Sequence, residues 1–180
     1  MALGATIHVF DIELANSDRG VYESLELRVA RHPSETADYL LTRVLAYCLE
    51  HAEGIAFSNG LSDPDEPAIA IRDLTGALQV WIDIGAPEAN RLRRASKAAP
   101  RVAVYTHKDA EQLAARLAGE KIHRIEALEL YAVDREWLAT LAERLTRRMK
   151  FTLTVSEQHV YLSLGEETLS TVIRRVPVQT

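Results

Sequence analysis

The stretch Asp65–His107, DEPAIAIRDLTGALQVWIDIGAPEANRLRRASKAAPRVAVYTH, decides the fold. Residues 68–72 and 77–84 are rich in β-branched side chains and flank a short turn that ends in glycine, which predicts a β-hairpin. Residues 87–100 begin and end with proline and predict a helix, and residues 101–107 predict another strand. A strand, a helix and a second strand in this order are typical of the crossover unit of α/β folds.

The rest of the chain adds strands and helices on both sides of this stretch. Residues 5–30 alternate apolar and polar side chains around one turn and predict a hairpin. Apolar side chains recur at helical spacing after Pro33, which predicts a helix with Glu35 in its first turn, and residues 57–67 have the composition of a loop. A helix, a strand, a helix and a last hairpin are expected at residues 108–120, 123–133, 134–148 and 150–176. The predicted fold class is α/β, with a mixed central sheet flanked by helices and additional N- and C-terminal hairpins.

Composition bounds the class of protein. The chain has 180 residues and a formal net charge of -5, so we expect one domain over residues 1–180. No apolar run is long enough to span a membrane, and the N-terminus lacks a basic segment followed by an apolar block, so we expect neither a membrane span nor export. The single cysteine, Cys48, excludes an internal disulfide and suits the reducing cytoplasm, where we expect the protein.

Four carboxylates suggest a metal site, and they are Glu35, Asp65, Glu66 and Asp83. Asp83 is unusual because it lies near the end of a strand that is otherwise apolar. If the fold brings the four acids together, their oxygens suit a hard cation such as Mg²⁺, which can activate water for attack at phosphorus. Each acid also has an ordinary explanation, since Glu35 suits a helix N-terminus and the other three suit a solvated loop or strand end. Their joint placement favours the metal site.

The helix predicted after Asp83 is strongly basic. Its cations, and one just past its end, are Arg91, Arg93, Arg94, Lys97 and Arg101, against the single acid Glu88. Such a helix is most often a solvated face. In a chain of net negative charge, however, it also forms a local field that a phosphodiester would feel. We therefore expect nucleic acid to bind, if it binds at all, through Arg91, Arg93, Arg94 and Lys97.

Other catalytic chemistry has little support. The six histidines form no HExxH pattern, and the sequence contains no GxSxG elbow, phosphate loop or GxGxxG turn. Cys48 lies in the apolar stripe of its predicted helix, so packing explains it. These absences argue against serine hydrolysis and nucleotide binding.

The order of hairpin, acid, helix and strand resembles the core of the PD-(D/E)xK nuclease superfamily. More closely, the segments RVARHPSET, GLSDPDEP, LTGALQVWIDIG and RLRRASKA resemble the YaeQ family of small bacterial proteins, over nearly the whole chain. The resemblance implies a restriction-endonuclease-like core in which Glu35 is the helix-borne glutamate and Asp83 is the second acid of the hairpin.

Two positions depart from the nuclease pattern. The superfamily usually has a lysine two residues after the second acid, where this chain has Gly85. A cation of the next helix would have to replace it, and Lys97 and Arg93 are the candidates. The family pattern also often has an acid at Ala68, which leaves Asp65 or Glu66 to act in its place.

Two functions follow from the resemblance. The first is a Mg²⁺-dependent nuclease, in which the four acids bind metal and water while Lys97 or Arg93 braces the phosphate. The alternative is a catalytically inactive module of nuclease fold that binds nucleic acid or a protein partner. Converging carboxylates repel one another, so the metal site predicts that Asp83→Asn stabilises the metal-free protein by on the order of 1 kcal/mol.

Overall fold

The computed structural model describes residues 4–58 and 63–179, and these form two compact units. The first unit comprises the chain up to Leu41 together with Asp134–Ile173, and the second comprises Thr42–Val133 and the chain from Arg174 onward. Part of the predicted loop at residues 57–67, namely residues 59–62, lies outside the described residues. That residues 1–180 fold as one domain stays a prediction.

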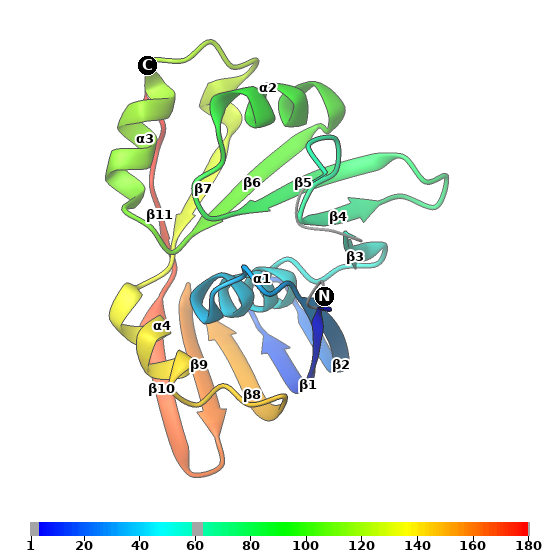
Figure 1. Ribbon diagram of the computed structural model, residues 1–180, viewed down its shortest axis with the longest axis vertical. Coiled ribbons are helices and arrows are strands. Elements are labelled where there is room, and N and C mark those ends of the chain that lie inside the picture. The colour runs from blue at the N-terminus through cyan, green and yellow to red at the C-terminus, as the bar shows by residue number, and fades with distance from the viewer. Residues whose placement is uncertain (1–3, 59–62, 180) are drawn as a thin grey trace. The chain divides into compact units, whose positions relative to one another are not determined.

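The first unit is built on a five-stranded mixed sheet with the order β10-β9-β8-β1-β2 (Figure 1). Its strands are β1 (Thr6–Asn16), β2 (Val21–Arg31), β8 (Arg148–Ser156), β9 (His159–Leu164) and β10 (Glu167–Val172). β1 and β8 run parallel, and the other neighbours are antiparallel. Alternate side chains of β1, such as Phe10, Ile12 and Leu14, are buried, as expected for a sheet with one face on a core. The helix α4 (Arg135–Ala142) belongs to the same unit.

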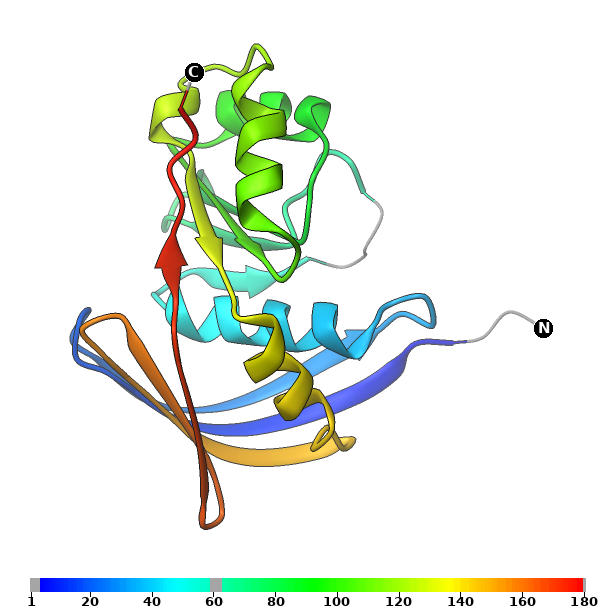
Figure 2. The ribbon, with the colours of Figure 1, turned by 90° about the vertical axis from the view of Figure 1, so that its left-hand side faces the viewer.

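The second unit contains a six-stranded mixed sheet with the order β11-β7-β6-β5-β4-β3. Its strands are β3 (Ile55–Phe57), β4 (Ile69–Arg72), β5 (Leu78–Ile84), β6 (Arg101–Thr106), β7 (Glu129–Ala132) and β11 (Arg174–Arg175). β4 and β5 form the predicted antiparallel hairpin, whereas β5, β6 and β7 run parallel to one another. The short C-terminal strand β11 runs antiparallel beside β7 (Figure 2).

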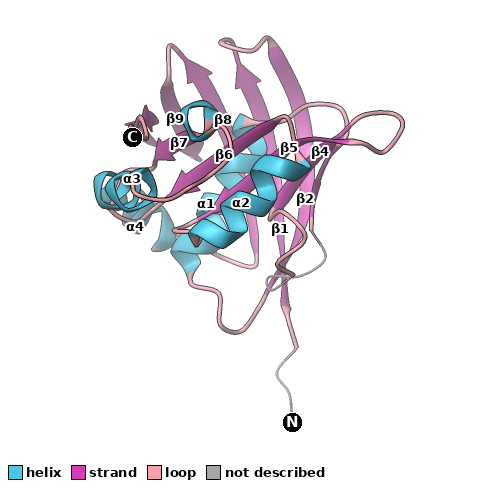
Figure 3. Ribbon diagram, turned by 90° about the horizontal axis from the view of Figure 1, so that it is seen from above, coloured by secondary structure: helices cyan, strands magenta, loops and turns pink. Residues whose placement is uncertain are grey.

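Helices α2 (Ala89–Ala98) and α3 (Ala110–Ala118) pack on one face of this sheet. Figure 3 shows α2 crossing over β5 and β6. Leu92 of α2 and Leu117 of α3 are fully buried in a cluster with Trp81 of β5. Helix α1 (Ala37–Leu49) begins in the first unit and ends in the second. The hairpin, helix and strand predicted for residues 68–107 are thus confirmed, as is the mixed α/β class.

The single central sheet of the prediction is replaced by two sheets. Strands β1, β2, β8, β9 and β10 do not extend the sheet that contains Asp83, because β1 pairs in parallel with β8 and these strands form a sheet of their own. Of the C-terminal strands, β11 joins the sheet of Asp83. The segment expected as one last hairpin forms the three strands β8, β9 and β10, followed by β11. Pairing between strands this far apart in the chain is not encoded in local periodicity.

Two helix boundaries also differ from the prediction. Helix α1 begins at Ala37 and not near Pro33, because Thr36 acts as its N-cap: its Oγ1 accepts a hydrogen bond from Tyr39 N at 3.1 Å. Glu35 therefore lies in the turn before the helix and not in its first turn. Helix α4 ends at Ala142, so only the first part of the predicted helical segment 134–148 is α-helix. The rest of that segment leads into β8.

One predicted strand and one predicted loop also differ from the structure. Residues 123–133 form the short 3₁₀ helix η1 (Ile125–Ala127) before β7, and are not one continuous strand. The left-handed backbone of Arg124, with φ 52°, breaks the extended chain there. Strand β3 occupies part of the segment expected to be loop before residue 59.

Two other expectations concern the membrane and the thiol. No helix in the described ranges is long and apolar enough to cross a membrane. Cys48 is buried, and burial raises the pKa of its thiol to about 12, so at neutral pH the group is a packed, protonated side chain.

Gly54 provides a test of how tightly β4 is held. Its φ is 87°, and a Cβ atom there would lie 2.0 Å from the carbonyl oxygen of Arg72. Since both backbone strain and a backbone clash would result, we expect Gly54→Ala to lower the free energy of unfolding by about 2 kcal/mol. Gly76 also has φ 87° but faces open space, so Gly76→Ala is the matched control and should cost about 1 kcal/mol. Urea denaturation measures both, and equal losses would contradict the close approach.

Candidate functional site

Asp83 is buried in β5 and bound by an arginine of the next helix. Its side chain is 3% exposed, and Arg91 Nε donates to Asp83 Oδ2 at 2.7 Å while Arg91 Nη2 lies 3.0 Å from Oδ1. This is the bidentate geometry in which a guanidinium binds a carboxylate most strongly. The arrangement answers why an apolar strand carries this acid, because the charge is compensated by Arg91 inside the fold.

Arg91 also holds the chain that leads into β4. Its Nη1 donates to Asp63 O at 3.0 Å and its Nη2 donates to Glu66 O at 2.6 Å. The guanidinium carbon lies 5.3 Å from the ring centroid of Trp81, within the range of a cation–π contact. Asp83 Oδ1 accepts a further hydrogen bond from Ala68 N at 3.3 Å. The ion pair therefore fixes residues 63–68 against β5 and α2.

The predicted metal ligands are not gathered by these contacts. Asp65 is 79% exposed and lies 3.5 Å from Arg94, and Glu66 takes part through its backbone oxygen. In residues 4–58 and 63–179, no group of three or more His, Cys, Asp or Glu side chains could hold a metal ion. Both oxygens of Asp83 are engaged by Arg91, so in this arrangement Asp83 does not fit the role of a carboxylate ligand to Mg²⁺, which proteins hold through one or two carboxylates together with water.

Glu35 lies in the first unit, whereas the other three predicted acids lie in the second. It is buried, its Oε1 accepts from His32 N at 3.3 Å, and its own N donates to His32 O at 2.9 Å. Arg31 Nε donates to the carbonyl oxygen of Glu35 at 3.0 Å. These contacts shape the turn before α1. That Glu35, Asp65, Glu66 and Asp83 bind one metal ion stays a prediction.

The basic residues of α2 divide into two groups. Arg91 and Arg93 are partly buried and paired with carboxylates, since Arg91 binds Asp83 and Arg93 donates to the Glu120 carboxylate at 2.6 Å and to Lys121 O at 2.8 Å. Arg94 is about half exposed, and its pair with Asp65 at 3.5 Å is of the kind that contributes little. Lys97 is exposed. Of the four predicted nucleic-acid contacts, the most exposed are thus Arg94 and Lys97.

The position of the missing nuclease lysine has a backbone explanation. Gly85 directly follows β5 and has φ 87°, and its N–H donates to Tyr105 O at 2.9 Å. A lysine would be strained in this left-handed conformation. Neither proposed substitute is bonded to Asp83: Arg93 contacts Glu120, and Lys97 lies about 9 Å further along the helix axis than Arg91 at a rise of roughly 1.5 Å per residue.

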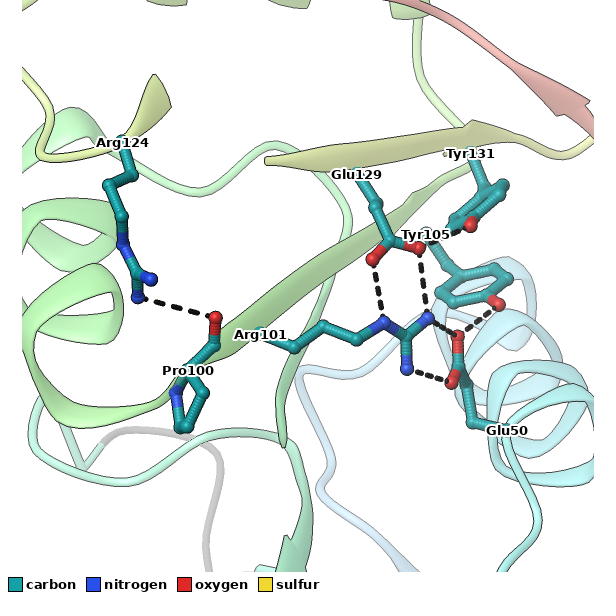
Figure 4. A network of polar contacts seen from close by, with 7 residues as sticks. All are labelled: Glu50, Pro100, Arg101, Tyr105, Arg124, Glu129 and Tyr131. Atoms are coloured by element: carbon teal, nitrogen blue, oxygen red, sulfur yellow. Dashed lines mark hydrogen bonds and ion pairs between the residues drawn. The ribbon is translucent and has the colours of Figure 1, made fainter. Parts of the chain in front are cut away.

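A second buried polar cluster joins α1 to the opposite face of the sheet (Figure 4). Arg101 lies between two carboxylates, with Nη1 and Nη2 at 2.7 and 2.9 Å from the Glu50 oxygens and Nε at 2.6 Å from Glu129. Glu50 follows the C-terminal end of α1, and its side chain is only 4% exposed. The guanidinium compensates the buried charge of Glu50 and the partly buried charge of Glu129, and it ties the end of the helix to β6 and β7.

Two stacked tyrosines complete this cluster. The Tyr105 hydroxyl donates to Glu50 at 2.7 Å, the Tyr131 hydroxyl donates to Glu129, and the ring centroids are 4.9 Å apart. Burial, followed by the neighbouring carboxylate, raises the pKa of Tyr105, and the same causes raise the pKa of Tyr131 to about 12. Burial pushes the pKa of Glu129 upward, but hydrogen bonds from Arg101 and Tyr131 outweigh it and the pKa is lowered.

The sequence did not reveal this cluster, although two signals were present. Arg101 and Tyr105 share one face of β6, and Glu129 and Tyr131 share the same face of the parallel strand β7. Polar residues that alternate along adjacent buried strands predict an internal network. Because these side chains bind one another from α1, β6 and β7, we interpret the cluster as structural.

Comparison with known proteins places these features in a family. The family model described as YaeQ protein matches residues 1–173. The chain is 31% identical over 164 residues to the Escherichia coli K12 protein described as "Uncharacterized protein YaeQ", and 32% identical over 164 residues to the YaeQ protein of Salmonella typhi, with 91% of each chain covered in both comparisons.

Two crystal structures share the fold. The YaeQ protein from Pseudomonas syringae superposes with a TM-score of 0.85 at 30% identity, covering 96% of both chains. The YaeQ protein from Xanthomonas axonopodis pv. citri gives a TM-score of 0.83 at 29% identity, covering 96% of this chain and 99% of that one.

Proposed function

The chain belongs to the YaeQ family, and from this premise we propose that it binds the phosphodiester backbone of nucleic acid without metal-dependent catalysis. The observation that carries the proposal is the pairing of Asp83 with Arg91. In this pairing, Arg91 binds both oxygens of Asp83, the acid on which metal chemistry would depend. It leaves Arg94 and Lys97 as the cations that α2 offers to a ligand.

Electrostatics supports a phosphate ligand over an acidic protein surface. Phosphodiester affinity comes largely from cations that replace condensed counterions, and it requires no deep cleft. The exposed cations at the end of α2 meet this requirement in a chain whose net charge is -5, so the attraction must be local. A protein partner would instead require an apolar centre surrounded by a polar rim.

A binding titration tests the proposal. Labelled single-stranded and double-stranded oligonucleotides are titrated with protein in the presence of a chelator, and fluorescence anisotropy is followed at several salt concentrations. We expect binding that survives chelation and weakens steeply with salt. The double variant Arg94→Ala/Lys97→Ala should reduce the slope of log K against log salt by about 2, one unit per lost phosphate contact.

Lys108→Ala is the matched control, because Lys108 is exposed but follows the opposite end of β6 from the α2 terminus. It should leave the slope unchanged. Binding that requires a divalent metal, or a slope that is the same in all three proteins, would overturn the proposal.

The Mg²⁺-dependent nuclease remains the second candidate, and one observation favours it. The hairpin β4–β5, the helix α2 and the parallel strand β6 follow one another in the order of a PD-(D/E)xK core, with Asp83 near the end of β5. A shared order of elements does not establish an activity. Cleavage of DNA or RNA that requires Mg²⁺ and disappears in Asp83→Ala would establish the nuclease, whereas equal cleavage by both proteins would indicate contamination.

A further inference from the structure

A pocket opens on the second unit where α2 ends. Its lining consists of the last turn of α2 with the chain that follows and two residues before η1, namely Ser96, Lys97, Ala98, Ala99, Pro100, His123 and Arg124. No carboxylate is among these residues. Lys97 and Arg124 each carry a permanent positive charge, and His123 adds a third basic group.

Arg124 is held in an uncommon backbone conformation at this pocket. Its φ and ψ are 52° and 44°, the left-handed region that non-glycine residues rarely occupy. Its Nη2 donates to Pro100 O at 3.3 Å (Figure 4) and to Ala99 O at 3.5 Å. Both bonds are long, and a guanidinium has five N–H donors. In the described part of the chain, its Nε and Nη1 have no hydrogen-bond partner, so these donors are available to a ligand.

The cations of this pocket differ from the other cations of α2. Arg91, Arg93 and Arg94 each lie against a carboxylate, respectively that of Asp83, Glu120 and Asp65. For Lys97 and Arg124, the described residues supply no ion pair. A pair of basic side chains without counter-charges is therefore present at the pocket, although the chain as a whole is acidic.

The C-terminal end of α2 repels an anion, and this repulsion has to be compared with the attraction from Lys97 and Arg124. A helix C-terminus carries roughly half a negative charge. Lys97 and Arg124 together carry two positive charges, and Arg124 also covers the carbonyl groups of Ala99 and Pro100. The two cations therefore outweigh the partial negative charge of the helix end.

We propose that this pocket binds a phosphate group, with Lys97 and Arg124 donating to its oxygens. The inference rests on the proposed function in one respect, since the group would be a phosphate of bound nucleic acid. Phosphate suits the pocket because its oxygens can accept from the Lys97 ammonium and from Nε or Nη1 of Arg124. The pocket gives α2 an anchor point, and Arg94 then contributes a weaker contact along the backbone.

Backbone NMR titration with inorganic phosphate tests the pocket without nucleic acid. We expect amide shifts concentrated at residues 96–99 and 123–124, and a dissociation constant that rises about tenfold in Lys97→Ala, as for the loss of one hydrogen bond to a charged group. Arg124→Asn should have the same effect, because asparagine tolerates the left-handed backbone but has no charge. Arg124→Lys should restore most of the affinity, and Lys108→Ala should retain all of it.

Oligonucleotides carrying a 5′-phosphate or a 5′-hydroxyl then distinguish a terminal phosphate from an internal one. Preference for the 5′-phosphate that is lost in Arg124→Asn assigns the pocket to strand ends, and equal affinity that falls in the variant assigns it to the backbone. Phosphate shifts that are absent, or unchanged in both charge-removing variants, would overturn the inference. Nucleic-acid binding that depends on Arg94 alone would support the proposed function but contradict a role for this pocket. Phosphate binding without nucleic-acid binding would contradict only the proposed function.

Discussion

Asp83→Asn is expected to lower the free energy of unfolding by about 3 kcal/mol, because it leaves the guanidinium of Arg91 without its carboxylate in a largely buried site. Asp83 is 3% exposed and Arg91 is 25% exposed, so solvent compensates little of the loss. The opposite sign, a gain on the order of 1 kcal/mol, is what a cluster of repelling metal ligands would give.

A double-mutant cycle isolates the pair. Urea denaturation of Asp83→Asn, Arg91→Met and the double variant should give a coupling energy of about 2 kcal/mol. Asp65→Asn is the control, since its pair with Arg94 is exposed, and it should change stability by less than about 0.5 kcal/mol. Additive effects of the two substitutions would contradict the ion pair.

Arg101→Met is expected to lower the free energy of unfolding by more, about 4 kcal/mol at pH 7, because the buried carboxylate of Glu50 and the partly buried carboxylate of Glu129 lose their shared cation. The same substitution at Arg93 is the matched control. Arg93 and Arg101 are equally exposed at 34%, but the partner of Arg93 is 41% exposed whereas Glu50 is 4% exposed. Arg93→Met should therefore cost only about 1 kcal/mol.

The cost of Arg101→Met should depend on pH. In the unmodified protein the lowered pKa of Glu129 contributes stability that is present above its ordinary pKa of 4.5 and is lost as pH falls through the lowered value. In the variant, Glu129 loses the hydrogen bond from Arg101 that lowers its pKa, so this contribution to stability becomes smaller. The stability difference between the two proteins should therefore be constant above pH 4.5 and shrink as pH falls below it. A difference that is constant with pH would show that Arg101 acts by packing alone.

The sequence predicted the local parts of this structure well. Alternation and the flanking prolines located β4, β5, α2 and β6, because those signals arise from side chains within one element. Asp83 was singled out by its apolar surroundings, but its partner Arg91 was not identified. Arg91 was assigned to a solvent-facing basic surface, because helical periodicity alone does not show which side chain reaches a neighbouring strand.

Long-range arrangements were beyond the reach of periodicity. Arg101 meets Glu50 from 51 residues away and Glu129 from 28 residues away, so only the completed sheet brings the three together. The division of the strands into two sheets has the same origin, since β1 pairs with β8 across most of the chain. The pocket at the end of α2 also depends on a tertiary contact, between Arg124 and the carbonyl groups of residues 99 and 100.

Thermal denaturation of the protein in chelator and in millimolar Mg²⁺ most directly tests the claim that Asp83 serves Arg91 and not a metal ion. The ion pair predicts the same Tm in both solutions, and a lower Tm for Asp83→Asn that is equally insensitive to Mg²⁺. A metal site occupied at a hundred times its Kd would add about 2.7 kcal/mol and raise Tm by roughly 5 °C or more. A rise of that size in the unmodified protein, abolished in Asp83→Asn, would contradict the ion-pair interpretation.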